Sequence, residues 1–278
     1  MNRLAASLIL IGALILTASN AVVKSAGLGD LSLLEVSFAR FAISTLVYWP
    51  LFLREKRPIK SLIDPLLFFR GVIGFMAIVL NYHAAMTISL GNATLLNLTS
   101  PLFTFLLAPL LLGEHIEKKK FLWLLLAFAG VVIISPFHLG SANWSGYASG
   151  LASGLCAASA YMTIRKLHER ESFIAISFSY SLIATTLCLF ASVFGIFRFS
   201  ALLSNWPILL VIGILGTLYQ GLYTLALRFE KASRLAPLLY LSVIASFALG
   251  YFEFGERITV INSFGATLVM VSLIMLMK

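Results

Sequence analysis

The stretch LLFFRGVIGFMAIVLNYHAAM, residues 66–86, contains a single formally charged residue. A helix needs about 20 predominantly apolar residues to cross the hydrocarbon core of a bilayer, so this stretch predicts a transmembrane helix. Its two glycines, Gly71 and Gly74, match Gly213 and Gly216 at an offset of 142 residues. The stretch therefore predicts both a membrane protein and an internal repeat.

Similar apolar stretches occur along the whole chain, in which 60% of the residues are apolar and only 11% are charged. This composition excludes an ordinary water-soluble domain and predicts an all-α protein of ten transmembrane helices. The first stretch also resembles a secretory signal peptide, but it is long and many others follow it, which favours a retained helix. The ten predicted spans are Leu4–Val23, Leu33–Leu53, Leu66–Met86, Ala93–Leu112, Phe121–Phe137, Gly146–Ile164, Phe173–Phe197, Trp206–Leu227, Leu235–Phe252 and Val260–Met277.

The basic residues between the spans predict the orientation of the chain. Residues 54–60, 118–120, 165–170 and 228–234 are rich in Lys and Arg, whereas the alternate connections hold only Lys24, Arg198 and Arg257. Because cytoplasmic loops of membrane proteins carry the excess of positive charge, both termini are expected in the cytoplasm of a multi-pass inner-membrane protein. The net charge of +9 is spread over these loops, so no nucleic-acid partner is expected.

Further matches support the internal repeat at a near-constant offset along half the chain. Leu112–Ile116 matches Phe254–Ile258 at an offset of 142 residues, and Ser37-Phe38 matches Ser177-Phe178 at an offset of 140. We therefore expect two five-helix repeats, residues 1–139 and 140–278. A repeat with an odd number of helices must insert its second copy upside down, and inverted repeats with a site near the midplane are common among transporters.

The same residues carry a resemblance to a known family. In the first half these residues are Arg70–Ala85, Thr99–Pro101 and Leu111–Glu114. In the second half the corresponding residues are Gly213–Ala226 and Gly255-Glu256, and the same pattern includes Arg40, Gly130 and Gly265. This pattern resembles the drug/metabolite transporter superfamily, specifically its ten-helix members with EamA domains. The resemblance covers essentially the whole chain and implies a solute carrier without ATPase activity.

Polar side chains within the spans are candidates for the substrate site, because such groups are costly in a membrane unless they face the bundle interior or water. Two clusters occur at repeat-related positions, one in the third span and one in the eighth. Their residues, with three further positions in the first, fourth and ninth spans, are Asn81, Tyr82, His83, Tyr219, Gln220, Tyr223, Asn20, Asn97 and Tyr240. For His83, a proton relay and a structural hydrogen bond to a neighbouring helix are both open.

Three charged residues are expected to have structural or gating roles. Arg40 lies about two turns inside the second span, and Glu35 is a poor partner for it because it lies about 140° away around the helix. Arg40 either anchors the helix or neutralises an anionic group of the substrate. Glu114 and Glu256 end the fourth and ninth spans symmetrically, which favours a structural role, either pairing with basic loop residues or capping a helix of the other half.

Several classes of function lack their motifs. The sequence has no GxxxxGK[ST] loop, no HExxH or GxSxG motif, and its two cysteines, Cys156 and Cys188, belong to no metal-ligand cluster. We therefore expect no cofactor and no metal. The sequence predicts a secondary active transporter of a small organic metabolite, working by alternating access in the lipid bilayer as a monomer or homodimer. The alternatives are an intramembrane enzyme acting on a lipid or polyprenyl substrate, and a channel.

Overall fold

A computed structural model describes residues 2–29, 31–55, 64–112, 118–134, 143–168, 170–193, 197–230 and 232–277. Within these ranges the regular structure is entirely helical, with no β-strand. The helices are α1 (Arg3–Leu28), α2 (Leu33–Arg54), α3 (Pro65–Thr87), α4 (Leu90–Asn97), α5 (Ser100–Leu112), α6 (Lys118–Ile134), α7 (Trp144–Leu167), α8 (Phe173–Ala191), α9 (Phe199–Ser204), α10 (Trp206–Phe229), α11 (Ala232–Phe254) and α12 (Val260–Met277).

Polar caps define where several helices begin. Ser32 and Glu35 form a reciprocal capping box at the start of α2, in which each side chain accepts the other residue's backbone N–H. At the start of α3 the side chain of Asp64 accepts the N–H of Leu66 at 2.6 Å. Pro65 has no N–H and therefore leaves no unpaired donor in this first turn. Such caps satisfy donors that the first turn of a helix leaves free, which matters most in a low-dielectric surrounding.

The predicted all-α membrane fold is confirmed. Each predicted span corresponds to one helix, except the fourth, which is divided into α4 and α5, while the short α9 lies between two spans. In the seventh predicted span, α8 ends at Ala191 and a π-helical turn continues to Val193, while residues 194–196 lie outside the described residues. By length and composition, α1, α2, α3, α8 and α10 can cross a membrane, and α6, α11 and α12 contribute shorter apolar stretches.

The outer surface of the bundle is apolar, as expected for a surface in contact with lipid. Leu46 on α2 is 72% exposed, Phe190 on α8 is 65% exposed and Phe264 on α12 is 62% exposed. An apolar surface of this extent is rare on monomeric soluble proteins. Together with the apolar helices, it makes this chain a multi-pass membrane protein.

The break between α4 and α5 lies in the middle of the predicted fourth span. The N–H of Thr99 turns back to the carbonyl of Leu96 at 3.1 Å, and Pro101 has no N–H with which to continue the ladder. Tyr240 of α11 donates its hydroxyl to the carbonyl of Leu98 at 3.4 Å. Gly154 allows α7 to pack closely against the backbone at this break, because a Cβ on Gly154 would meet the Leu96 carbonyl oxygen. Irregular backbone at this depth is tolerated because protein groups surround it.

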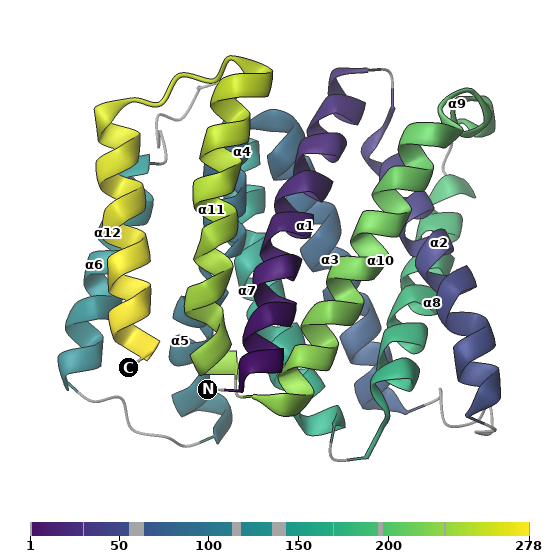
Figure 1. The fold of residues 1–278 in the computed structure, drawn as a ribbon, viewed down its shortest axis with the longest axis horizontal. Helices are drawn as coiled ribbons and strands as arrows, with labels where there is room; N and C mark the ends of the chain where they lie inside the picture. Colours follow the sequence, from purple (N-terminus) through teal and green to yellow (C-terminus); the bar gives the residue numbers. More distant parts are fainter. Residues whose placement is uncertain are drawn as a thin grey trace.

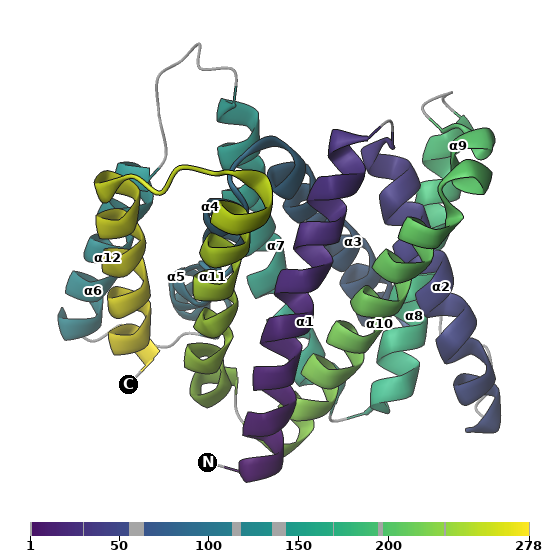
Figure 2. The same cartoon turned by 45° about the horizontal axis from the view of Figure 1, so that its top comes forward.

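The contacts between helices follow the repeat: when each helix is replaced by its counterpart in the other half, one observed helix pair becomes another. Helix α3 packs on α7 as α1 packs on α10, and α2 packs on α10 as α8 packs on α3. Helices α2 and α8 contact each other, as do α6 and α12, the latter pair lying side by side at one end of the bundle (Figure 1). Both chain termini lie on the same side of the bundle (Figures 1 and 2). That this side faces the cytoplasm stays a prediction.

Two contacts between equivalent helices show the inverted relation at single residues. The hydroxyls of Thr45 and Thr185, which are 140 residues apart, lie 3.0 Å from each other between α2 and α8. At the other end of the bundle, a Cβ on Gly130 would meet the carbonyl oxygen of Gly265, and a Cβ on Gly265 would meet that of Gly130. The repeat predicted from the sequence is therefore built around self-paired helices.

Candidate functional site

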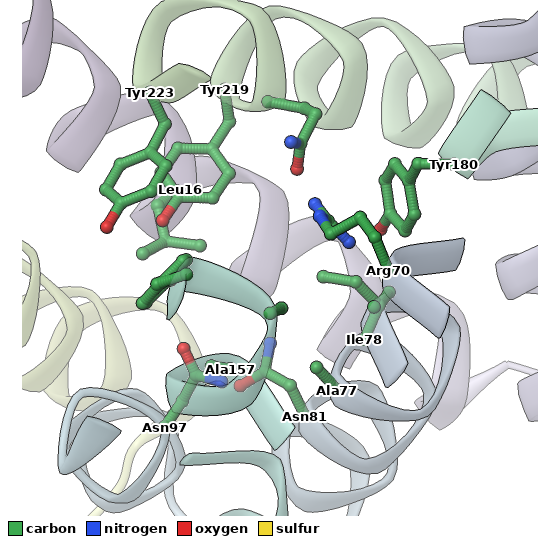
Figure 3. A pocket seen from close by; sticks show the side chains of 14 residues that line it. Leu16, Arg70, Ala77, Ile78, Asn81, Asn97, Ala157, Tyr180, Tyr219 and Tyr223 are labelled. Carbon is green, nitrogen blue, oxygen red and sulfur yellow. The ribbon is translucent and has the colours of Figure 1, made fainter. Parts of the chain in front are cut away.

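A narrow cavity lies inside the bundle between helices of both halves (Figure 3). Helices α1, α3 and α4 of the first half and α7, α8 and α10 of the second half contribute to its lining. Its polar lining residues are Arg70, Asn81, Asn97, Tyr161, Tyr180, Tyr219, Gln220 and Tyr223. A concave site at the interface of two repeats is where inverted-repeat carriers bind their solutes.

One face of α3 forms a side of the cavity. Arg70, Gly74, Ala77 and Asn81 follow one another at spacings of four, three and four residues, which places them on a single helical face. Gly74 and Ala77 are small, so they leave space beside this face for larger side chains that line the cavity. The spacing was present in the sequence but was not used to predict the site.

Tyrosines of α7 and α10 form an aromatic wall. The rings of Tyr219 and Tyr223 lie 5.9 Å apart, and the ring of Tyr161 lies 4.9 Å from that of Tyr223. Beside them, Gln220 donates its side-chain amide to the hydroxyl of Thr224 at 3.0 Å. The wall combines flat apolar faces with hydroxyl and amide groups, which is the composition expected of a site for a small organic molecule.

Arg70 is a cation in this cavity. Its side chain is 3% exposed, and its guanidinium lies 4.2 Å from the ring centroid of Tyr180. Neither Nε nor Nη1 has a hydrogen-bond partner among the described residues. Gly74 leaves the space that this guanidinium and the Tyr180 ring occupy, because a Cβ at Gly74 would collide with both. Figure 3 shows Arg70 and Tyr180 together at one end of the cavity.

Arg40 lies behind the cavity lining, where α2 meets α3 and α10. Its Nη1 donates to the Tyr82 hydroxyl at 3.2 Å, whereas its Nε has no partner in the described part of the chain. Gly216 of α10 leaves room for this side chain. Glu35 is engaged elsewhere, since its Oε1 accepts the backbone N–H of Arg198 at 2.9 Å. Arg40 therefore has a tyrosine as its hydrogen-bond partner, in an interior position consistent with an anchoring role.

A chain of buried hydrogen bonds connects the two halves beside the cavity. Asn81 donates its amide to the carbonyl oxygen of Asn20 at 3.2 Å, and Asn20 donates its own to the hydroxyl of Thr94 at 3.3 Å. Thr94 lies 2.9 Å from the hydroxyl of Ser246 on α11, and Thr17 on α1 donates to the Ser242 carbonyl at 3.0 Å. Asn20 is therefore part of the support behind Asn81 rather than of the lining.

The other predicted substrate residues face different neighbours. Asn97 lines the cavity and donates to the hydroxyl of Ser153 at 3.0 Å. Tyr82 is directed to Arg40, Tyr240 to the helix break, and His83 to α7, where its Nδ1 lies 3.0 Å from the hydroxyl of Ser149. Of the nine predicted positions, the structure thus gathers Asn81, Asn97, Tyr219, Gln220 and Tyr223 around the cavity. Arg70, Tyr161 and Tyr180 were missed as site residues.

Glu256 joins the two halves at the end of the bundle opposite the termini. Its carboxylate lies 2.9 Å from Nζ of Lys24 on α1 and accepts the N–H of Leu90, the first residue of α4, at 2.9 Å. Lys24 also donates to the Ile88 carbonyl at the end of α3, at 2.6 Å. Glu256 therefore both pairs with a basic residue and caps a helix of the other half. Glu114, its counterpart in the repeat, lies outside the described residues.

In the described residues, no group of three or more His, Cys, Asp or Glu side chains is placed to hold a metal ion.

Comparison with known proteins assigns the family. The profile of the EamA-like transporter family matches the chain twice, at residues 3–135 and 144–278. The pseudopaline exporter CntI of Pseudomonas aeruginosa is 32% identical over 93% of this chain and 90% of its own length. The human solute carrier family 35 member G1 is 29% identical, covering 78% of this chain and 64% of its own.

Two further similarities agree with this assignment. The S-adenosylmethionine uptake transporter of Rickettsia bellii is 27% identical over 80% of this chain and 76% of its own. A crystal structure that is 17% identical superimposes with a TM-score of 0.66, covering 99% of this chain and 97% of the other, which shows a shared fold. The relatives are transporters rather than enzymes, and both the profile and the identity extend over nearly the whole chain. This protein is a small-molecule transporter that belongs to the EamA-like transporter family.

Proposed function

We propose that the protein is a secondary active transporter that moves a small organic metabolite across the inner membrane by alternating access. One observation carries the proposal: a polar cavity lies between the inverted halves. In addition, the Lys24–Glu256 pair joins the two halves at one end of the bundle. Alternating access needs a site that both halves share and contacts that form on one side when they break on the other. The cavity supplies the first, and the Lys24–Glu256 pair is a candidate for the second.

The relatives support an organic solute. Pseudopaline export and S-adenosylmethionine uptake are both transport of organic molecules, although they run in opposite directions. The cavity wall of Tyr161, Tyr219 and Tyr223 suits such a solute, since aromatic faces contact its apolar parts while the hydroxyl groups fix its orientation. The absence of an ATP-binding loop from the sequence favours a carrier driven by a proton gradient, another ion gradient or exchange.

Coupling to protons through His83 receives little support from its position. The ring of His83 is hydrogen-bonded to Ser149 on α7 and does not belong to the cavity lining. We therefore assign it a role in holding α3 against α7. Of the two hypotheses that the sequence left open, the structural hydrogen bond is the one that this position favours.

The test is transport by the purified protein in proteoliposomes. Radiolabelled amino acids, cofactors and related metabolites are offered under imposed gradients of protons, sodium or membrane potential. A carrier shows saturable uptake and counterflow, in which excess unlabelled solute on one side drives labelled solute to its own side. Conductance without counterflow would indicate a channel instead, and chemical change of the solute would indicate an enzyme.

A further inference from the structure

We propose that the transported solute carries an oxyanion group, a carboxylate or a phosphate, and that Arg70 binds this group inside the cavity. The inference rests on the carrier function proposed above, because it names the chemistry of the solute that the same cavity takes. It starts from the guanidinium of Arg70, which is 3% exposed and lines the cavity, and whose Nε and Nη1 have no hydrogen-bond partner among the residues that the structure describes.

A purely structural role does not account for this arrangement. A structural arginine in a membrane pairs with a carboxylate or donates to backbone carbonyls, because an unpaired charge in such a place is costly. Arg70 has no salt bridge with any carboxylate in the described ranges, and its ring contact with Tyr180 satisfies none of its N–H donors by a conventional hydrogen bond. The other buried cation nearby, Arg40, has the same sign and raises the cost further.

The geometry indicates where the oxyanion binds. Nη1 of Arg70 lies against Gly74, one turn further along α3, so the charged head lies at the end of the cavity where Tyr180 also lies (Figure 3). The Tyr180 ring centroid lies 4.2 Å from Cζ of Arg70, so we place the oxyanion on the side of the guanidinium that this ring does not cover. A planar guanidinium with free N–H groups matches the two oxygens of a carboxylate or phosphate.

The rest of the cavity suggests what the oxyanion is attached to. Asn81 lies seven residues beyond Gly74, about 10 Å along the helix axis at 1.5 Å per residue. Its side-chain oxygen is buried and has no partner in the described part of the chain, and its amide group donates to Asn20. The free oxygen can accept an N–H or O–H of the solute. The site therefore fits an elongated metabolite with an oxyanion at one end, an amino or hydroxyl group at the other, and a body against the tyrosine wall.

The first test measures binding by thermal stability of the purified, detergent-solubilised protein. Oxyanion solutes are compared with uncharged partners of the same shape: succinate with succinamide, glutamate with glutamine, and glycerol 3-phosphate with glycerol. We expect at least one oxyanion to raise Tm saturably while its partner does not, because a ligand that binds only the folded protein stabilises it. In R70Q the apparent affinity should fall at least tenfold. The matched control R165Q removes an exposed arginine at the end of α7 and should bind like wild type.

The same variants separate binding from structure without any ligand. If Arg70 is held unpaired for function, R70Q should have a ligand-free Tm equal to or above that of wild type. The inference is overturned if R70Q lowers the ligand-free Tm and keeps its affinity, if the best stabilising solute is neutral or cationic, or if no oxyanion in the panel stabilises wild type. An Arg70-dependent shift given only by phosphatidylglycerol micelles, and not by phosphatidylcholine, would also overturn it in favour of a lipid headgroup.

Should R70Q fail to fold, the wild-type protein supplies the measurement. Phenylglyoxal modifies arginine side chains, and peptide mass spectrometry resolves Arg70 from the others. A bound oxyanion should slow modification of Arg70 at least fivefold and leave that of Arg165 unchanged; equal rates with and without the oxyanion would refute the assignment. Counterflow distinguishes the two proposals. If a neutral solute shows counterflow and R70Q retains it, the oxyanion proposal is refuted while the carrier proposal stands. If binding depends on Arg70 but no solute shows counterflow, the carrier proposal is refuted.

Discussion

The contact between Lys24 and Glu256 allows a quantitative test of alternating access. The two side chains are 11% and 14% exposed, so solvent screens their attraction only weakly. Glu256→Gln keeps an amide oxygen that can still accept the N–H of Leu90, but it removes the negative charge opposite Lys24. Hydrogen bonds to charged groups contribute about 1.5–3 kcal/mol each, so the substitution should weaken this closure by roughly 1–3 kcal/mol.

If the closure breaks in the transport cycle, that loss changes the ratio of the two states. Each 1.4 kcal/mol corresponds to about a tenfold change, so the open state on the side opposite the termini should gain roughly 5- to 100-fold in population. The assay is labelling of Leu16→Cys, a cavity position on α1, by a membrane-impermeant thiol reagent in a background without Cys156 and Cys188. The labelling rate from the side opposite the termini should rise by the same factor.

The matched control is Glu253→Gln, which removes an exposed carboxylate one turn before Glu256 and should leave the rate unchanged. Lys24→Met should act in the same direction as Glu256→Gln, and the double variant should add little, since both remove one interaction. If Glu256→Gln lowers Tm but leaves labelling from both sides as in wild type, the pair only caps α4 and the gating argument is refuted.

Four further results are expected. Gln220→Ala and Tyr223→Ala should each reduce transport at least tenfold while the protein remains folded, because they remove groups of the cavity wall; normal transport by both would exclude this cavity. Arg40→Gln should lower the free energy of unfolding by about 1–3 kcal/mol, since it leaves the buried Tyr82 hydroxyl without its partner, and thermal unfolding measures this. His83→Gln should leave the pH dependence of transport unchanged, because the ring faces Ser149; a flattened pH profile would restore the proton relay. Cysteines at Lys166 and Ser204 should be labelled from opposite sides of the membrane, with Lys166 on the cytoplasmic side, and labelling from one common side would contradict the ten-span topology.

The fold could be predicted from the sequence because lipid imposes a simple rule on each segment. An apolar stretch of sufficient length must be a helix, and basic loops set its direction, so the succession of spans needs no knowledge of tertiary contacts. The break between α4 and α5 depends on such contacts. Pro101 lacks an N–H with which to continue the helix, but the turn lies at Leu98 and Thr99, where Tyr240 donates to the Leu98 carbonyl and Gly154 leaves space for the backbone.

The site was predicted only in part, and helix geometry explains one of the errors. Asn81, Tyr82 and His83 are consecutive, so their side chains point about 100° apart and cannot all face one cavity. The structure directs Asn81 to the cavity, Tyr82 to Arg40 and His83 to α7. On α10 all three predicted residues line the cavity, because Tyr219 and Tyr223 are one turn apart and Gln220 lies beside them on the same side of the helix.

Arg70 was missed for a different reason. It lies four residues inside a predicted span, where an arginine commonly extends to the membrane surface. Which way it points depends on the rotation of α3 against α7 and α8, and no local pattern fixes that rotation. Its spacing to Gly74, Ala77 and Asn81 was the available signal, because small residues between two polar ones on a single face leave space beside that face.

The repeat also explains why a symmetric bundle can hold a single, asymmetric site. Arg40 on α2 and Tyr180 on α8 are repeat-related at an offset of 140 residues, and each packs against an equivalent glycine, Gly216 on α10 and Gly74 on α3. The packing against these two glycines is thus equivalent in the two halves. The side chains differ: Tyr180 is neutral and lies over Arg70, whereas Arg40 is charged and donates to Tyr82. Of these two positions, Tyr180 lines the cavity beside Arg70, whereas Arg40 does not belong to the lining. Under the two proposals made above, the symmetric packing serves the alternation of the two halves, and the difference between these two positions places the charged group of the solute at one end.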